Sequence, residues 1–273
     1  MRNYPDPPIG GVGAPCLNLM REASAEAPAM VELGTVTRDL LASSDAGLDE
    51  HAVAKRICQA CVAGLDVDGA VISLLTATVS RETLWATDPT AELLEELQFT
   101  LNEGACMEAA TTGVPVLVAD LHHSTDVQRW PIFAAAVAEQ ADVRALFAFP
   151  LQWGTVNVGV LDLYRKTPGA LSAAQCRDAI SASETGASML LGVRTDPGHT
   201  DADGLPGGSW LDHSHSSRAE IHQATGIVLA QLGISAQDAL ARMRAYAFVE
   251  RRLLIDVARE VVSRRLQFTA QMK

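Results

Sequence analysis

Four residues near the C-terminal end of the chain have side chains suited to binding a polyanion: Arg244, Tyr246, Arg251 and Arg252. Guanidinium groups neutralise phosphates, and a tyrosine ring can stack on an unpaired base of a nucleic acid. Gln223 adds a side-chain amide that both donates and accepts hydrogen bonds. The alternative for Tyr246 is a place in helix packing, and the arginines would then only solvate a helical surface.

Three helices are predicted to position these residues, within 217–266. A capping box of Ser217 and Glu220 favours the start of the first helix. Gly233 is expected to end it, and Ser235 to cap the second. The apolar face of the first helix is predicted at Ile221, Ala224, Val228 and Leu232. The third helix, with the arginine pair at its start, is predicted from an apolar stripe at Leu253, Leu254, Val257, Ala258, Val261 and Val262.

The basic character is concentrated at this end of the chain. From Arg218 to Lys273 nine basic residues stand against five acidic ones, a net charge of +4, while the whole chain carries −12. The preceding 217 residues therefore carry −16. A basic helical module on an acidic protein favours a polyanionic partner. Charged helix surfaces are common, however, so charge alone does not decide between a binding face and a solvated one.

The order of motifs in this stretch resembles the ANTAR domain, a three-helix RNA-binding module of bacterial transcription antiterminators. The matching string is IHQATGIVLAQLGISAQDALARMRAYA, followed by LLIDVAREVV, so the resemblance covers essentially all of residues 217–266. Two features depart from the family pattern: Thr225 stands where many members carry lysine, and an arginine pair replaces polar residues that often cap the third helix. The resemblance implies an RNA-binding surface at Gln223, Thr225, Arg244, Tyr246, Arg251 and Arg252.

The preceding part of the chain, residues 30–193, alternates helix and strand patterns. The predicted order is two helices within 31–64, strands at 69–76 and 81–87, a helix from Pro89, a short helix at 103–111, a strand at 115–119, a helix at 131–140, strands at 143–151 and 158–164, and a closing helix at 172–193. Antiparallel hairpins between groups of helices predict an α+β domain, followed by the all-α C-terminal module.

Residues 30–193 resemble a GAF domain, through NEGAC (102–106), PVLVADL (115–121), RWPIF (129–133), VRALFAFPLQ and VGVLDLYRKTPGALS. GAF domains bind many ligands or none, between the sheet and its covering helices. The N-K-x-F-D-E motif of cyclic-nucleotide-binding members is absent, and no cysteine has a context that suggests bilin attachment. The resemblance implies ligand contacts from Ser73, Trp85, Cys106, Asp120, Trp130 and Phe133. For the three aromatic residues, a plain place in the core is the alternative.

Catalysis finds little support in the sequence, which has no G-x-S-x-G, H-E-x-x-H or Walker loop. Cys58 and Cys61 form a C-x-x-C, but no second pair completes a tetrahedral metal site, and their helical pattern predicts small core cysteines. Cys106 is the alternative centre, of a thiol redox enzyme, which requires a lowered thiol pKa. We therefore predict no enzyme activity, no cofactor and no metal site.

Two further stretches have the composition of terminal or connecting segments. Residues 1–29 hold five prolines and three glycines, which predicts a disordered tail. Residues 194–216, dominated by Gly, Asp, Pro and Ser, predict a flexible linker, in which His213 and His215 are expected to be solvated. No apolar run reaches the length of a membrane span, and no signal peptide is recognised, so a cytoplasmic protein is expected.

These features predict a signal-responsive regulator of transcription antitermination. The GAF part would sense an unidentified small molecule, and the C-terminal helices would bind hairpins in nascent leader RNA so that a terminator does not form. A homodimer is expected because paired hairpins match paired modules. Two alternatives remain: a helix-turn-helix regulator that binds DNA, and a thiol redox enzyme of the GAF type.

Overall fold

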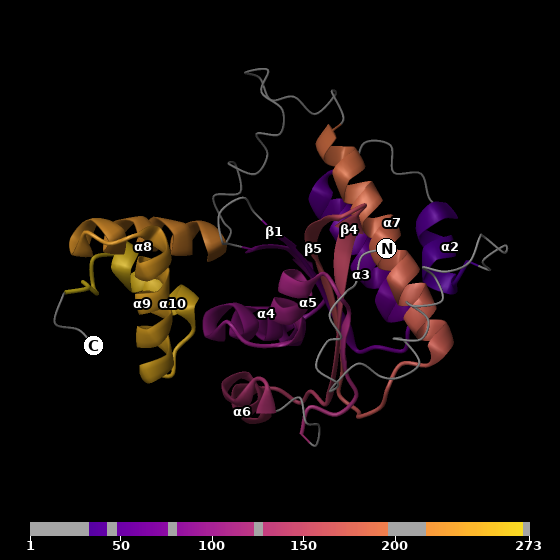
Figure 1. Cartoon of the computed structure of the whole chain (residues 1–273), viewed down its shortest axis with the longest axis horizontal. Coiled ribbons are helices and arrows are strands. Elements are labelled where there is room, and N and C mark those ends of the chain that lie inside the picture. Colours follow the sequence, from indigo (N-terminus) through magenta and orange to yellow (C-terminus); the bar gives the residue numbers. More distant parts are fainter. Residues whose placement is uncertain (1–32, 43–47, 76–80, 123–127, 196–216, 270–273) are drawn as a thin grey trace, which may run out of the picture.

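The computed structural model describes residues 33–42, 48–75, 81–122, 128–195 and 217–269 (Figure 1). The predicted tail, almost all of the predicted linker and both linker histidines lie outside the described residues, as does the side chain of Ser217 in the predicted capping box. No helix within these ranges is both long enough and apolar enough to cross a membrane.

The predicted helices and strands are confirmed in type and order, with shifts at their ends. The helices of the first part are α2 (Thr35–Ala42), α3 (Glu50–Gly64), α4 (Pro89–Leu101), α5 (Ala105–Thr112), α6 (Pro131–Gln140) and α7 (Ala173–Thr195). The strands are β1 (Gly69–Leu75), β2 (Arg81–Ala86), β3 (Val116–Val118), β4 (Ala145–Trp153) and β5 (Val156–Arg165). The C-terminal helices are α8 (Ser217–Leu232), α9 (Ala236–Val249) and α10 (Leu254–Val262).

The five strands form one antiparallel sheet in the order β2-β1-β5-β4-β3. This order brings the first hairpin beside the last strand, so that Ile72 of β1 lies between Leu161 of β5 and Trp85 of β2. Successive side chains of a strand point to opposite faces of the sheet. Leu161 and Leu163 of β5 therefore join the core on one face, while Asp162 between them points to the other, where it meets α4.

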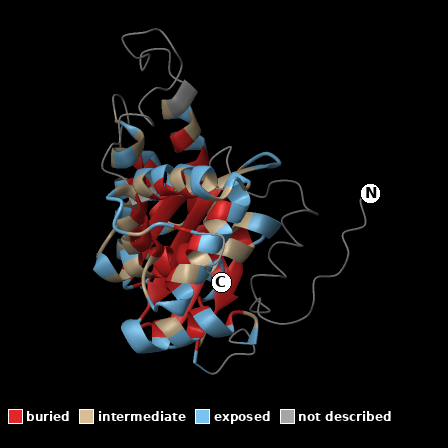
Figure 2. Ribbon diagram, turned by 90° about the vertical axis from the view of Figure 1, so that its left-hand side faces the viewer, coloured by how far each residue is buried: buried red, intermediate tan, exposed pale blue. Residues whose placement is uncertain are grey.

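Helices cover both faces of the sheet (Figure 1). Helices α2, α3 and α7 lie on one face and α4, α5 and α6 on the other, and Figure 2 shows the buried residues gathered between the layers. The periodicity of α3 explains its place, since Val53, Ile57 and Cys61 are spaced four apart and are fully buried. The carboxylate of Asp178 on α7 accepts hydrogen bonds from the first N–H groups of α2, at Val36 and Thr37, and so fixes the two helices together.

Local sequence also explains the ends of the C-terminal helices. The left-handed Gly233 follows α8, and the Ser235 hydroxyl accepts a hydrogen bond from the Asp238 N–H at 3.1 Å to cap α9. Helix α9 ends in a left-handed residue that is not glycine: Arg251 has a φ of 53°, and the next N–H, of Arg252, donates to the carbonyl of Ala247. The arginine pair thus forms the turn after α9, and α10 begins only at residue 254.

The C-terminal helices lie beside α4, as Figure 1 shows. Phe99 of α4 is buried in the hydrophobic core of these helices rather than in the core of its own domain. The next residue, Thr100, accepts a hydrogen bond through its hydroxyl oxygen from the N–H of Leu254, at 3.2 Å. Leu253, which precedes α10, supplies no side-chain cap. Helix α4 of the sheet domain therefore caps the first turn of α10.

Candidate functional site

Arg244 lies at the junction between the two parts of the protein. Its guanidinium carbon is 4.8 Å from the centre of the Phe99 ring, a cation–π contact from α9 to α4. Phe99 is only 1% exposed, so the ring presents its face to the arginine away from water. Contacts of this kind contribute about 0.5–2 kcal/mol, more when they are desolvated. One of the predicted RNA-binding arginines is therefore used in holding the C-terminal helices against the sheet domain.

Tyr246 is half-buried and packs on Phe268, with the ring centres 5.5 Å apart and the planes at 67°. This edge-to-face arrangement is typical of aromatic pairs in protein cores, so Tyr246 takes part in packing, as its alternative role required. The sequence prediction missed another aromatic residue, Phe248, which is 51% exposed beside Val249 at 68%. The signal was present, because the inward spacing of Met243 and Ala247 turns Phe248 to solvent.

The two arginines after α9 have different surroundings. Arg252 is half-buried and forms an ion pair with Glu260 at 2.9 Å. The hydrogen bond within this pair raises the pKa of Arg252 and lowers the pKa of Glu260. Arg251 is exposed, and its N–H donates to the carbonyl of Phe248. Phe248, Val249 and Arg251 therefore form one exposed group, called here the α9-end patch. It combines an aromatic ring, an apolar side chain and a cation.

The two predicted residues of α8 face different ways. Gln223 is exposed, whereas the hydroxyl of Thr225 donates to the carbonyl of Ile221 at 2.7 Å and lies 3.9 Å from the sulfur of Met243 on α9. Thr225 thus faces the neighbouring helix. Gly226 is exposed, and a Cβ built on it would have nothing within 4 Å. The predicted RNA-binding residues are thereby divided: Gln223 and Arg251 are exposed, whereas Thr225, Arg244, Tyr246 and Arg252 contact other parts of the protein.

The residues predicted to contact a ligand do not share one face of the sheet. Ser73 of β1 and Cys106 of α5 are both buried, with the hydroxyl oxygen 3.9 Å from the sulfur. Trp85 lies on the opposite face, under α3. The centre of its ring is 5.3 Å from the centre of the His51 ring and 5.0 Å from the Lys55 ammonium. A ligand that contacts Cys106 on the α4 and α5 side is therefore separated from Trp85 by the sheet.

The other three predicted residues lie toward β3 and α6. Asp120, just after β3, forms a two-pronged ion pair with Arg144, with the closest approach at 2.9 Å. Trp130 and Phe133 are buried in the same hydrophobic cluster as Cys106, and the guanidinium of Arg129 lies 4.7 Å from the Trp130 ring. The geometry of these two aromatic residues agrees with a role in the core, which was the alternative for them.

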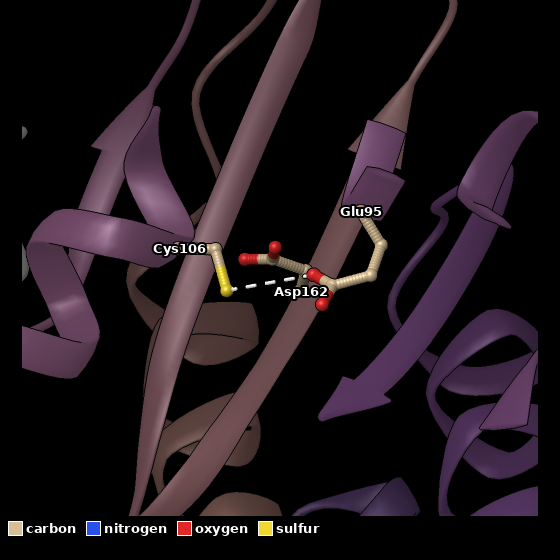
Figure 3. Close-up of side chains that lie close together, drawn as sticks. All are labelled: Glu95, Cys106 and Asp162. Carbon is tan, nitrogen blue, oxygen red and sulfur yellow. Dashed lines mark hydrogen bonds between the residues drawn. The ribbon is translucent and has the colours of Figure 1, made fainter. Parts of the chain in front are cut away.

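A buried polar cluster that the sequence prediction largely missed surrounds Cys106 (Figure 3). Glu95 of α4 and Asp162 of β5 join the thiol, and one ligand atom from each of these three residues lies within 4.8 Å of the others. Gln98 links the group, since its amide donates to Asp162 at 2.8 Å and accepts from the Cys106 N–H at 2.8 Å. An aspartate at the inward position of the central strand VGVLDLY was the available signal.

The C-x-x-C pair of α3 has the properties of core residues. Cys58 and Cys61 are fully buried on the opposite side of the sheet from Cys106. Burial raises the pKa of Cys58 well above its ordinary value and that of Cys61 to about 12. Because the thiolate is the reactive form, both thiols are inert at neutral pH, as expected for small core cysteines.

Comparison with known proteins agrees with this architecture. The model of the GAF domain matches residues 47–190, and that of the ANTAR domain matches residues 211–262. No curated protein matches the chain. Similar solved structures include the GAF domain of a phosphoenolpyruvate-protein phosphotransferase from Coxiella burnetii (TM-score 0.46, 11% identity, covering 66% of this chain and 94% of that one).

Two more solved structures have similar scores. The corresponding GAF domain from Acinetobacter has a TM-score of 0.42 at 12% identity, covering 66% of this chain and 95% of that one. Free methionine-R-sulfoxide reductase from Neisseria meningitidis has a TM-score of 0.42 at 14% identity, covering 58% and 86%. The family models carry the assignment, since the first spans more than half of the 273 residues. The chain belongs to the GAF domain family, and its C-terminal helices form an ANTAR domain.

Proposed function

We propose that this protein is a signal-controlled RNA-binding regulator, whose ANTAR helices bind hairpins in nascent leader transcripts and so prevent termination. A GAF domain joined to an ANTAR domain supports a regulator of the ANTAR type rather than an enzyme. The observation that carries the proposal is the contact of Arg244 with Phe99, because it links a candidate RNA-binding arginine directly to the sensor domain.

The α9-end patch is the part of the ANTAR domain best suited to an unpaired RNA loop. The exposed ring of Phe248 offers a stacking surface, and Arg251 beside it offers a charge for phosphate. Stacking of a base on an aromatic side chain contributes about 1–3 kcal/mol. Phe248→Ser is therefore expected to weaken hairpin binding more than Tyr246→Phe, which keeps a ring that already packs on Phe268.

Docking of the ANTAR helices on α4 competes with RNA for Arg244. While the guanidinium lies over Phe99, one of its faces is covered by the ring. A signal that displaces α4 would release the arginine and raise the affinity for RNA. Population shifts of this kind require only a difference in free energy between the docked and the released arrangements.

Phe99→Leu tests this competition, because leucine keeps the apolar filling of the ANTAR core and removes the aromatic face under Arg244. Phe149→Leu is the matched control, since Phe149 is equally buried but lies in the core on the α3 side of the sheet. In equilibrium binding to a paired-hairpin RNA, the first variant should bind more tightly than the parent, and the control should not. A weaker complex for Phe99→Leu, with the fold intact, contradicts the competition.

The same assay separates RNA from DNA as the partner. We expect hairpin RNA to bind more tightly than a DNA duplex of equal length at the same salt concentration. A preference for the duplex would favour the helix-turn-helix alternative. We also propose a cytoplasmic homodimer, since two hairpins call for two ANTAR modules. Sedimentation at micromolar concentration, with and without the RNA, tests the stoichiometry.

A further inference from the structure

We propose that Glu95, Cys106 and Asp162 form a binding site for a divalent transition-metal ion of the zinc or iron(II) class. The three side chains come from three elements, α4, α5 and β5, and point toward one another (Figure 3). Glu95 is 2% exposed, Cys106 0% and Asp162 9%, so the group is shielded from water on the α4 side of the sheet. Two carboxylates and a thiol are all metal ligands.

The spacing of the ligand atoms suits one ion. The Cys106 sulfur lies 3.9 Å from a Glu95 oxygen, and one atom from each residue lies within 4.8 Å of the others. Zinc binds sulfur at about 2.3 Å and carboxylate oxygen at about 2.0–2.2 Å. Binding of one ion therefore requires the three atoms to move closer together, through rotations about the side-chain bonds of all three residues. The thiolate selects against Mg²⁺ and Ca²⁺, which prefer oxygen ligands alone.

A second layer of contacts holds the ligands in place. The Gln98 amide donates to the Asp162 carboxylate and accepts from the Cys106 N–H, so it orients two of the three ligands. Gly104 leaves room for Gln98, because a Cβ at that position would lie 2.5 Å from the Gln98 oxygen. Cys106 also lies in the first turn of α5, where the helix dipole favours a negative charge. Such outer contacts typically tune metal affinity by about 10–100-fold.

Metal binding offsets most of the negative charge of the site, because the ion carries +2 and the two carboxylates and the thiolate carry −3. Two adjacent buried carboxylates are costly unless a proton or a cation lies between them. When the ion enters, the Cys106 S–H bond breaks, the proton leaves to solvent and a sulfur–metal bond forms, so binding releases a proton. Three protein ligands leave at least one position of the metal open to water or to a small donor molecule.

The site lies on the helix that reaches the ANTAR domain. Glu95 lies beside the Cys106 thiol and Gln98 donates to Asp162 of β5, while the next two residues, Phe99 and Thr100, contact α9 and α10. Closing Glu95 on an ion therefore acts on the helix that docks the ANTAR domain. This coupling rests on the proposed RNA-binding function, whereas the metal site itself does not.

Cobalt(II) titration of the metal-free, full-length protein tests the site, because a cobalt–thiolate bond gives a charge-transfer absorption band that carboxylates do not. We expect the band in the parent and its loss in Cys106→Ser. The matched control is Cys61→Ser, a buried cysteine on the other side of the sheet, which should keep the band. Absence of the band in the parent, or its loss in Cys61→Ser alone, overturns the proposal.

Near-isosteric variants keep the test valid if a cysteine variant fails to fold. Glu95→Gln and Asp162→Asn remove one charge each but preserve shape, and both should weaken zinc binding at least tenfold in a competition titration with a chromogenic chelator. Unchanged zinc affinity in both variants, with native circular dichroism, also overturns the proposal. Hairpin-RNA binding is then measured with and without zinc. A cobalt band without RNA binding leaves the metal site intact and contradicts only the proposed function.

Discussion

Arg251 combines an exposed charge with a backbone conformation that favours glycine. Its φ of 53° ends α9 in the left-handed region, which costs most residues roughly 1 kcal/mol. A glycine there would keep the turn at lower conformational cost and would lose the guanidinium. A residue that is unfavourable for the turn but well placed beside Phe248 has the features expected of a binding residue.

Arg251→Gly should therefore leave the protein at least as stable and weaken binding to RNA. If the side chain contacts one phosphate, the slope of log affinity against log salt should fall by about 0.7–0.9. Arg264→Gly is the matched control, because Arg264 is also exposed and left-handed, with a φ of 59° after α10. If the salt slope falls equally in both variants, only the net charge of the protein affects binding, and Arg251 does not contact the RNA.

Tyr164 gives the GAF domain a defined response to alkaline pH. Burial, and then its hydrogen bond to Asp88 at 2.9 Å, raise the pKa of Tyr164 to about 12, from about 10 in an unfolded chain. The folded state holds the phenol proton more tightly, so the stabilisation is complete below pH 10 and is lost as pH rises toward 12. Urea unfolding from pH 8 to 11 should show this fall in the free energy of unfolding. In Tyr164→Phe, the free energy of unfolding should fall less steeply above pH 10.

At the scale of a helix, Gly226 is unexpected, because it occupies the middle of α8 with open space around it. Glycine in a helix interior is about 1 kcal/mol less favourable than alanine, so Gly226→Ala should raise the free energy of unfolding by about that amount. Gln223, three residues earlier, lies on the same exposed face. If RNA approaches this face closely, the stabilised variant should bind the hairpin more weakly. Unchanged RNA affinity would place the contact elsewhere.

The elements of this protein were predictable because each signal is local. Ser235 caps its helix through its own neighbours, and the apolar spacing of α3 defines its buried face. The sites were less predictable because they depend on contacts between distant segments. Glu95 and Asp162 are far apart in the sequence, and only the strand order brings β5 under α4. For the same reason, the sequence did not reveal that Trp85 and Cys106 lie on opposite faces.

At the scale of the whole molecule, α4 joins the GAF sheet to the ANTAR helices. Its inner side reaches Asp162 through Gln98, and its last turn enters the ANTAR core through Phe99. Thr100 completes the connection, since its hydroxyl accepts from the N–H of Leu254 and donates to Glu96. One N–H group of the first turn of α10, that of Leu254, is thus satisfied by the other domain, so the stability of this turn depends on docking.

Removal of the Thr100 hydroxyl should therefore loosen the junction between the domains. Thr100→Val is nearly isosteric but leaves the N–H of Leu254 without this acceptor, and an unsatisfied buried donor costs about 1–3 kcal/mol. We expect faster amide hydrogen exchange at the start of α10 than in the parent, and tighter binding to hairpin RNA. The exchange rate of α3, which lies on the other side of the sheet, should stay the same. Thr100→Ser restores the hydroxyl and should restore the parent behaviour. If Thr100→Val exchanges like the parent at α10 and binds RNA equally, the junction does not control the ANTAR domain.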